Sequence, residues 1–336
     1  MTGANDTGAW WLPATESTVL KLAREGDPGF QTGERIKSIL ALETLSGSPG
    51  HGRGLIGDDQ ALIALRLSGG PAPRQALVLA EPGTLRELAA TGDVLGGAIL
   101  PGAVWKTMNL PSSSNDGSNI ATMGSLSADI GGVTNTTAKG IFVSADGGST
   151  WDTLVRIGDI VPEFDDSVIF TGFRDPVNSS TERGVAFLAT IKGPGVRRSN
   201  NDTLWWKVGG GQLRLVAREG DEPASGPSGA KWKSFTSLAL PGGGAGPIFT
   251  AALVPGAGSV ASANDCGLYA IDSDGILHEL IRRNQLLGDK VVKKFTVLKA
   301  VAGSQGVARS FNASYEIVAH VAFTDGGSAI VKVEVP

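Results

Sequence analysis

Leu215-Val216-Ala217-Arg218-Glu219-Gly220-Asp221 is the stretch that decides how this chain is organised. It nearly repeats Leu20-Lys21-Leu22-Ala23-Arg24-Glu25-Gly26-Asp27. Weaker copies are Leu88-Ala89-Ala90-Thr91-Gly92-Asp93 and Leu154-Val155-Arg156-Ile157-Gly158-Asp159, and a degenerate fifth is Leu280-Ile281-Arg282-Arg283-Asn284-Gln285. The copies end at residues 27, 93, 159, 221 and 285, so successive ends lie 66, 66, 62 and 64 residues apart. Self-similarity at a fixed period is the signature of repeat architectures, and five such units account for the chain.

A second marker follows each copy by about ten residues, and it is an apolar residue followed by lysine. It occurs as Ile36-Lys37, Trp105-Lys106, Trp232-Lys233 and Val292-Lys293. The third unit has Asp165-Asp166-Ser167-Val168 at this place and lacks the lysine.

Each unit contains four short runs of β-forming residues between turn-forming residues. In the fourth unit they are Phe235–Leu240, Ile248–Leu253, Gly267–Ile271 and Leu277–Ile281. Four antiparallel strands repeated radially describe a propeller blade. We therefore expect an all-β, five-bladed β-propeller that forms a single domain over residues 1–336. Its units are 28–93, 94–159, 160–221, 222–285, and 286–336 together with 1–27.

The two ends of the chain predict how the ring closes. The last unit has three strands of its own, Phe295–Lys299, Ile317–Phe323 and Ala329–Val335, so the N-terminal strand Thr18–Arg24 is expected to complete its blade. One strand is surplus, because Trp10–Leu12 and Ala329–Val335 both resemble third strands. Either of them can be the third strand of the closing blade.

Composition excludes several classes of protein. The 48 glycines and 17 prolines spread over 336 residues exclude a helical bundle, and 41% hydrophobic residues exclude overall disorder. A net charge of −4 argues against nucleic acid as a partner. No apolar run is long enough to span a membrane. The one cysteine, Cys266, forbids an intrachain disulfide, and Met1–Asp6 lacks signal-peptide features, so we expect any export signal to have been removed already.

One turn carries a specific motif. Ser144-Ala145-Asp146-Gly147-Gly148-Ser149-Thr150-Trp151 matches the Asp-box pattern Ser-x-Asp-x-Gly-x-Thr-Trp at Ser144, Asp146, Gly148, Thr150 and Trp151. We expect Asp146 to accept backbone N–H groups, the glycines to take positive φ and Trp151 to pack on the blade. Asp272-Ser273-Asp274-Gly275 is a degenerate relative. The motif indicates a structural turn and by itself no catalysis.

These markers together resemble one known group. A Leu-Val-Ala-Arg-Glu-Gly-Asp strand end, a third strand such as Gly267-Leu268-Tyr269-Ala270 and an Asn-rich turn before tryptophans are similar to tandem-repeat β-propeller-like proteins secreted by environmental bacteria, the choice-of-anchor type. The Asp box resembles that of sialidase-like propellers. The resemblance implies export and surface association rather than an activity. That group often carries a C-terminal sorting anchor; we expect none in the residues up to Pro336, which leaves the mode of attachment open.

An enzyme is the alternative hypothesis. A sialidase needs a tyrosine nucleophile, but Tyr269 and Tyr315 are both expected inside strands. Five-bladed glycosidases use carboxylates on innermost strands. Glu43 and Asp175 lie near first-strand ends, and Asp166 is a third available acid. Such acids are most simply solvated loop residues, so a carbohydrate-active hydrolase stays the alternative.

Metal and cofactor chemistry has little support. His51, His278 and His320 lie in different units without ligand spacing, so we expect no zinc and no cofactor. The clusters Asn115-Asp116-Gly117-Ser118-Asn119 and Asp272–Gly275 offer oxygen ligands to calcium without the ordered series of a calcium loop. Turn chemistry explains both clusters more simply.

The recurring charges are the residues with ring symmetry. They are Asp27, Asp93, Asp159 and Asp221 with Lys37, Lys106, Lys233 and Lys293. In the simpler interpretation, glycine takes a left-handed turn, aspartate caps it and lysine opens a strand at the solvent edge. In the functional one, these residues form a polar ring at the channel mouth that binds an anionic or sugar-like ligand.

The rim of the propeller is a second candidate surface. The fourth strands are apolar, as in Leu213–Val216 and Trp151–Val155, and Trp10-Trp11 and Trp205-Trp206 add aromatic area. Self-association or docking to a surface protein or glycan partner is one interpretation. We therefore expect a non-catalytic binding or structural module, extracellular or at the cell surface.

Overall fold

A computed structural model describes residues 7–11, 17–42, 60–97, 99–114, 116–179, 181, 183–297, 311 and 315–336. The chain divides into two compact units: unit 1 is Met1–Gly47 with Arg53–Ile157, and unit 2 is Ser48–Gly52 with Gly158–Pro336. Every regular element in the described ranges is a β-strand, which confirms the all-β class. Among the predictions, Met1–Asp6, Leu12, Glu43, His51, Asn115 and Lys299 lie outside the described residues.

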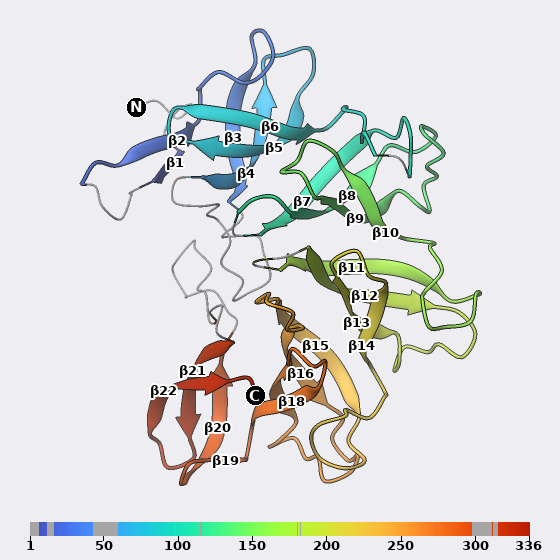
Figure 1. Ribbon diagram of the computed structural model, residues 1–336, viewed down its shortest axis with the longest axis vertical. Helices are drawn as coiled ribbons and strands as arrows, with labels where there is room; N and C mark the ends of the chain where they lie inside the picture. Colours follow the sequence, from blue (N-terminus) through green and yellow to red (C-terminus); the bar gives the residue numbers. More distant parts are fainter. Residues whose placement is uncertain are drawn as a thin grey trace. The chain divides into compact units, whose positions relative to one another are not determined.

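Unit 1 contains a two-stranded hairpin and two four-stranded antiparallel sheets (Figure 1). The hairpin pairs β1 (Gly8–Trp11) with β2 (Leu20–Arg24). Sheet 1 has the strands β3 (Arg35–Leu42), β4 (Ala61–Ser68), β5 (Arg74–Glu81) and β6 (Thr84–Ala90). Sheet 2 has the strands β7 (Trp105–Ser113), β8 (Ile120–Leu126), β9 (Lys139–Ser144) and β10 (Asp152–Arg156).

Unit 2 contains three more four-stranded sheets, in which neighbouring strands again follow chain order. Sheet 3 has the strands β11 (Ile169–Asn178), β12 (Gly184–Lys192), β13 (Asp202–Val208) and β14 (Leu213–Arg218). Sheet 4 has the strands β15 (Trp232–Ala239), β16 (Ile248–Leu253), β17 (Cys266–Ile271) and β18 (Leu277–Arg282). Sheet 5 has the strands β19 (Leu286–Leu287), β20 (Lys290–Thr296), β21 (Glu316–Phe323) and β22 (Ser328–Glu334).

The predicted strands of the fourth unit are confirmed as β15 to β18, with ends that differ by a few residues. One strand of the last unit was placed wrongly. Its first long strand, β20, begins at Lys290 rather than at Phe295, because Val292 already pairs with Phe323 of β21. The short β19 precedes it as a hairpin partner.

One turn recurs at all five copies of the repeated stretch, and we call it the Gly–Asp clamp. In the copy between sheets 1 and 2, the N–H of Gly92 donates to the carbonyl of Trp105, and the N–H of Trp105 donates to the carbonyl of Asp93, both at 2.9 Å. The other four copies make the same two bonds at 2.7–3.0 Å. Their residues are Gly26, Asp27 and Ile36; Gly158, Asp159 and Phe170; Gly220, Asp221 and Trp232; and Asn284, Gln285 and Val292.

The clamp requires a left-handed backbone at its first residue. The φ angles are 85° at Gly26, 95° at Gly92, 90° at Gly158, 86° at Gly220 and 61° at Asn284. Glycine takes this conformation without a Cβ clash, and asparagine tolerates it better than most residues. The apolar residue that receives the clamp is at most 2% exposed in every copy. The repeated Gly-Asp pair therefore connects a turn to a core residue of the next strand.

A β-bulge identifies the pair formed by a third and a fourth strand. In sheets 1 to 4 the pairing register skips one residue of the fourth strand, and the hairpin β1–β2 has the same irregularity. The skipped residues are Leu22, Leu88, Leu154, Val216 and Leu280. The pair β21–β22 is regular, as are the pairs of second and third strands. The register of β1–β2 is thus like that of a third and a fourth strand, and the register of β21–β22 is like that of a second and a third strand.

Apolar side chains pack between neighbouring sheets inside each unit. Leu77 of sheet 1 and Trp105 of sheet 2 belong to one buried cluster. Leu204 of sheet 3 packs in the same way with Trp232 of sheet 4. A third cluster joins sheets 4 and 5, and a fourth joins the β1–β2 hairpin to sheet 1. Within each unit, neighbouring sheets thus bury apolar side chains against one another, and such burial is the main stabilising contribution.

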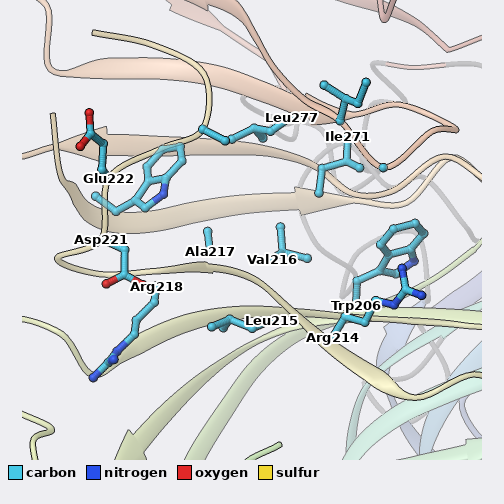
Figure 2. Close-up of a pocket in the computed structure, with 14 residues that line it drawn as sticks. Trp206, Arg214, Leu215, Val216, Ala217, Arg218, Asp221, Glu222, Ile271 and Leu277 are labelled. Atoms are coloured by element: carbon cyan, nitrogen blue, oxygen red, sulfur yellow. The ribbon is translucent and has the colours of Figure 1, made fainter. Parts of the chain in front are cut away.

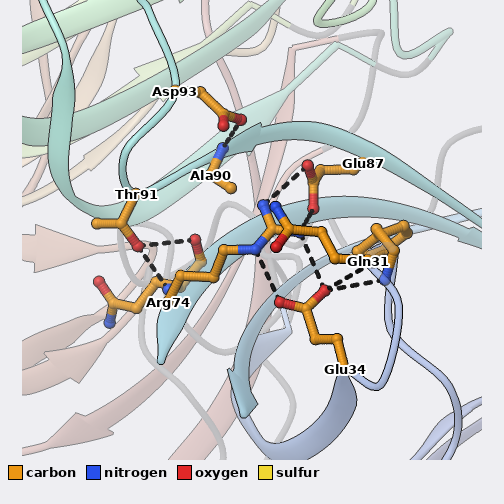
Figure 3. A network of polar contacts seen from close by, with 9 residues as sticks. Gln31, Glu34, Arg74, Glu87, Ala90, Thr91 and Asp93 are labelled. Carbon is orange, nitrogen blue, oxygen red and sulfur yellow. Dashed lines mark hydrogen bonds and ion pairs between the residues drawn. The ribbon is translucent and has the colours of Figure 1, made fainter. Parts of the chain in front are cut away.

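Sheet 1 also contains a buried ion network around Arg74 (Figure 3). The guanidinium donates from Nε and Nη2 to the two carboxylate oxygens of Glu34 at 2.8 and 3.0 Å, and from Nη1 to Glu87 at 3.0 Å. Glu34 Oε2 also accepts the backbone N–H groups of Phe30 and Gln31. These bonds hold the pKa of Glu34 below its ordinary value, chiefly through Arg74. The network ties the segment before β3 to β5 and β6.

Arg74→Met is expected to lower the free energy of unfolding by about 3 to 5 kcal/mol, because it leaves the buried Glu34 carboxylate unpaired. Since the pKa of Glu34 is lowered in the folded state, its stabilisation is present at neutral pH and is lost as the pH falls below about 4.3, through the lower folded pKa. Urea unfolding from pH 7 to pH 3 measures both effects. Lys290→Met, which breaks the exposed pair with Asp325, is the control and should change little. An equal loss in both variants would contradict the assigned role.

Gly92→Ala is expected to destabilise the protein by about 1 to 2 kcal/mol, because the clamp needs a positive φ that is unfavourable for alanine. A steric clash does not contribute, since no atom lies within 4 Å of the added Cβ. Gly210→Ala is the matched control, since its Cβ also meets nothing within 4 Å and its φ is not in the left-handed region. Thermal unfolding of both variants measures the difference. Equal melting temperatures would show that the clamp conformation contributes no stability.

Candidate functional site

The recurring lysines lie at a second set of β-bulges, on the first strands. In each sheet the register of the first long strand skips the residue that follows the clamped apolar residue. The skipped residues are Lys37, Lys106, Thr171, Lys233 and Lys293. A bulged residue has no partner across the ladder. The register thus places each of these lysines beside a Gly–Asp clamp.

The third unit needs a correction at this position. The sequence comparison aligned Asp165 with the clamped residues and Asp166 with the lysines, but the residue that receives the clamp is Phe170, followed by Thr171. The spacing from the Gly-Asp pair to the clamped residue varies between copies, and the third unit has no lysine to mark the clamped residue. The short ladder before Phe170, in which Val161 N–H donates to the Val168 carbonyl and Ile160 faces Ile169, has a counterpart before Trp105, where Val94 faces Val104. The hydroxyl of Thr171 lies 3.1 Å from that of Thr190.

The charges around the clamps differ in how they are used. Lys37, Lys106, Lys233 and Lys293 are exposed, and within the described ranges they make no hydrogen bond or ion pair. Several aspartates of the clamps are engaged: Asp27 pairs with Lys21 at 2.9 Å, and Asp93 accepts the N–H of Ala90 at 2.9 Å (Figure 3). The clamped end of four sheets therefore presents an ammonium group that no described residue neutralises.

The Asp box closes the turn between β9 and β10. Asp146 accepts the N–H of Thr150 at 2.9 Å and its hydroxyl at 2.7 Å, and the hydroxyl of Ser144 at 2.8 Å. The N–H of Gly148, whose φ is 88°, donates to Ser144 Oγ. Trp151 is 3% exposed and its indole Nε1 donates to the carbonyl of Leu88 in sheet 1 at 3.1 Å. The side chains of the box are thus used in the turn and in contact with the neighbouring sheet.

The candidate calcium turns use their oxygens internally. Asp272 accepts the N–H groups of Asp274 and Ile276 through Oδ1, and its Oδ2 lies 2.7 Å from His278 Nε2. Asp116 accepts from the hydroxyl groups of Ser114 and Ser118. In the part of the chain that the structure describes, no group of three His, Cys, Asp or Glu side chains is placed to hold a metal ion.

The acids of the hydrolase hypothesis are not brought together by any described contact. Asp166 is exposed in the turn before β11, and Asp175 lies in the second half of that strand, with its side chain outside the described residues. Glu43 is also outside them. Tyr269 is buried in β17, and burial raises the pKa of its phenol. Tyr315 was expected inside a strand, but it precedes β21 with a φ of 57° and donates to the Gly243 carbonyl at 2.6 Å.

The prediction that the Trp205-Trp206 pair adds exposed aromatic area to the rim is wrong. Trp205 is 0% exposed, and its indole donates to Thr203 Oγ1 at 2.8 Å, while Trp206 is 8% exposed. The reason is that both faces of β13 are buried, so alternation along the strand exposes neither tryptophan. Trp10 of β1 is 55% exposed and remains available on the surface.

A groove in unit 2 runs beside β14, between sheets 3 and 4, with a volume of about 530 Å³ (Figure 2). Its apolar lining includes Val216 and Leu277, which pack partly buried against the core. Arg214 lies near Trp206 at one end, and Arg218 lies with acidic side chains at the other. Sequence reasoning missed this groove, because its lining converges from five strands and two turns. The sequence signal nearby was the degenerate Asp box Asp272–Gly275, which Leu277 follows two residues later.

None of the described segments is a helix that could cross a membrane.

Comparison with known proteins shows a family and distant structural similarity. No curated protein matches the chain. A chain from a study of two prolyl endopeptidases is 14% identical with a TM-score of 0.38, over 82% of this chain and 31% of that chain. Oligogalacturonate lyase from Vibrio parahaemolyticus is 8% identical with a TM-score of 0.41, over 96% and 84%. Prolyl oligopeptidase B from Galerina marginata is 9% identical with a TM-score of 0.32, over 85% and 40%.

This chain thus spans less than a third of the length of the prolyl endopeptidase chain. A family model matches residues 57–336, and the protein therefore belongs to DUF7453, a family of unknown function.

Proposed function

We propose that the protein is a non-catalytic binding module that works outside the cell or at its surface, and that its clamped sheet ends bind an anionic ligand such as an acidic polysaccharide. The observation that carries this proposal is the position of Lys37, Lys106, Lys233 and Lys293, each exposed on a bulge and without a described partner. A β-bulge needs an exposed residue there but does not need a cation, as Thr171 illustrates.

Several exposed cations at equivalent positions act together on a ligand that carries many negative charges. One exposed ammonium contributes little to binding, because water and salt screen it. A polyanion meets several of them at once, and each contact adds to the total. The overall charge of −4 does not oppose this arrangement, since local fields are set by the groups that face the ligand.

We further propose that the five sheets close into one propeller, with the β1–β2 hairpin completing the last blade. Two observations support closure. The register of β1–β2 is like that of a third and a fourth strand, and sheet 5 ends with a pair whose register is like that of a second and a third strand. The side chains of β22 alternate between exposed and half-buried, whereas most of those in the third strand β17 are buried. In a ring, all clamps lie on one face, so the lysines surround a common axis.

The double variant Lys233→Gln, Lys293→Gln is expected to weaken binding of alginate, a linear polyanionic polysaccharide, by about fivefold, because two cations are lost from the binding face. The matched control is Arg183→Gln, Lys207→Gln, which removes two positive charges at the opposite end of sheet 3. Calorimetric titration at low salt measures both, with neutral dextran as a control ligand. Absence of alginate binding, or an equal loss in the control variant, would contradict the proposal.

Deletion of residues 1–24 tests closure. If the hairpin pairs with β22, its removal opens that strand edge, so the truncated protein should aggregate or lose cooperative unfolding. Hydrogen exchange makes the test specific: the amides of Ser328–Glu334 should lose protection, and those of Asp152–Arg156 in sheet 2 should not. Unchanged exchange in β22 would show that the hairpin does not complete its sheet.

A further inference from the structure

Trp151 and Leu277 occupy the same position in their sheets. The bulge of the third and fourth strands falls on Leu154 in sheet 2 and on Leu280 in sheet 4. Trp151 stands three residues before the first of these, and Leu277 stands three residues before the second. The last residue of the Asp box is therefore a tryptophan in sheet 2 and a leucine in sheet 4.

In unit 1 the indole of Trp151 fills the space between two sheets. It donates to the carbonyl of Leu88, the bulged residue of β6, at 3.1 Å. Its ring meets that of Trp105, the clamped residue of sheet 2, edge to face at a centroid distance of 5.8 Å. A large planar ring, an indole N–H and a bulge carbonyl thus complete this junction.

In unit 2 the corresponding contact, between sheets 3 and 4, has no indole at this position. Val216 is the bulged residue of β14 and Trp232 is the clamped residue of sheet 4, so they correspond to Leu88 and Trp105. Val216, Trp232 and Leu277 all line the groove of about 530 Å³ beside β14 (Figure 2). Such a volume falls in the range of small-molecule sites. The groove lies where the shorter Leu277 leaves the tryptophan position unfilled.

The groove also has a free cation at one end. Arg214 lines it two residues before Val216, which is about 7 Å along an extended strand. Arg214 is exposed, and among the residues that the structure describes it makes no hydrogen bond or ion pair. Arg218, by contrast, donates to the Asn200 carbonyl at 2.8 Å and lies over the ring of Phe164. Arg214 is thus the cation at the groove that remains available to a ligand.

The geometry points to a binding site for a small aromatic carboxylate. We propose that an indole-like ring enters the groove at the position that Trp151 occupies in unit 1, with a ring N–H directed to the carbonyl of Val216. The carboxylate of the ligand pairs with the guanidinium of Arg214, which suits carboxylate geometry. None of the four lysines lines the groove, so binding there is tested independently of the proposed function.

Indole-3-acetate is the probe, because its ring N–H and its carboxylate lie about as far apart as residues i and i+2 of a strand, which is the separation of Val216 and Arg214. Isothermal titration of the full chain is expected to show saturable binding. Leu277→Trp should abolish it, because the new indole fills the groove as Trp151 does. Arg214→Gln should weaken binding of indole-3-acetate about tenfold or more and leave binding of the uncharged 3-methylindole unchanged. Arg183→Gln, at the far end of sheet 3, is the charge-matched control and should bind as the original chain does.

Circular dichroism and thermal melting show whether Leu277→Trp folds; the expected result is an unchanged spectrum and an equal or higher melting temperature. If that variant does not fold, Trp151→Ala gives a second measurement, since indole should then bind the opened junction of unit 1 and raise its melting temperature. Absence of indole-3-acetate binding to the original chain overturns the proposal. So does binding that persists in a folded Leu277→Trp variant, or that Arg214→Gln and Arg183→Gln weaken equally.

Discussion

The pair of backbone hydrogen bonds in the Gly–Asp clamp is the interaction on which the rest of the structure depends. It fixes the last residue of one repeat against the first buried residue of the next strand, with bond lengths of 2.7–3.0 Å in all five copies. The turn that makes these bonds needs a positive φ, which explains glycine in four copies and asparagine in the fifth. Because the clamped residue is also a core residue, the hydrogen bonds and the apolar packing hold the same residue of each sheet in place.

Two sets of bulges then determine what the sheets present to solvent. The first-strand bulge lies next to the clamp and turns one residue outward, which is lysine in four sheets. The fourth-strand bulge lies under the end of the neighbouring sheet, where Trp151 covers it in unit 1. The strand register therefore determines both the exposure of the lysines and the position of the groove beside Val216. Both candidate binding surfaces follow from where the ladders skip a residue.

The sequence predicted those parts that depend on local chemistry. Gly-Asp spacing predicted the repeat, and turn residues around Ile248–Leu253 predicted strand β16 to the residue. It did not predict features that depend on pairing between distant segments. The Arg74 ion pair joins residues forty positions apart, and Trp205 is buried because both faces of its strand are covered. The position of Phe170 at the clamp was missed because the third unit has Thr171 in place of the lysine that follows the clamped residue in the other sheets.

Small-angle X-ray scattering of the full chain tests most directly whether the repeats form one ring. A single compact domain of 336 residues has a radius of gyration of about 20 Å. The proposed five-sheet propeller predicts this value, independent of protein concentration. Two units that move as separate bodies would give about 25 Å or more, and that result would contradict the closed ring.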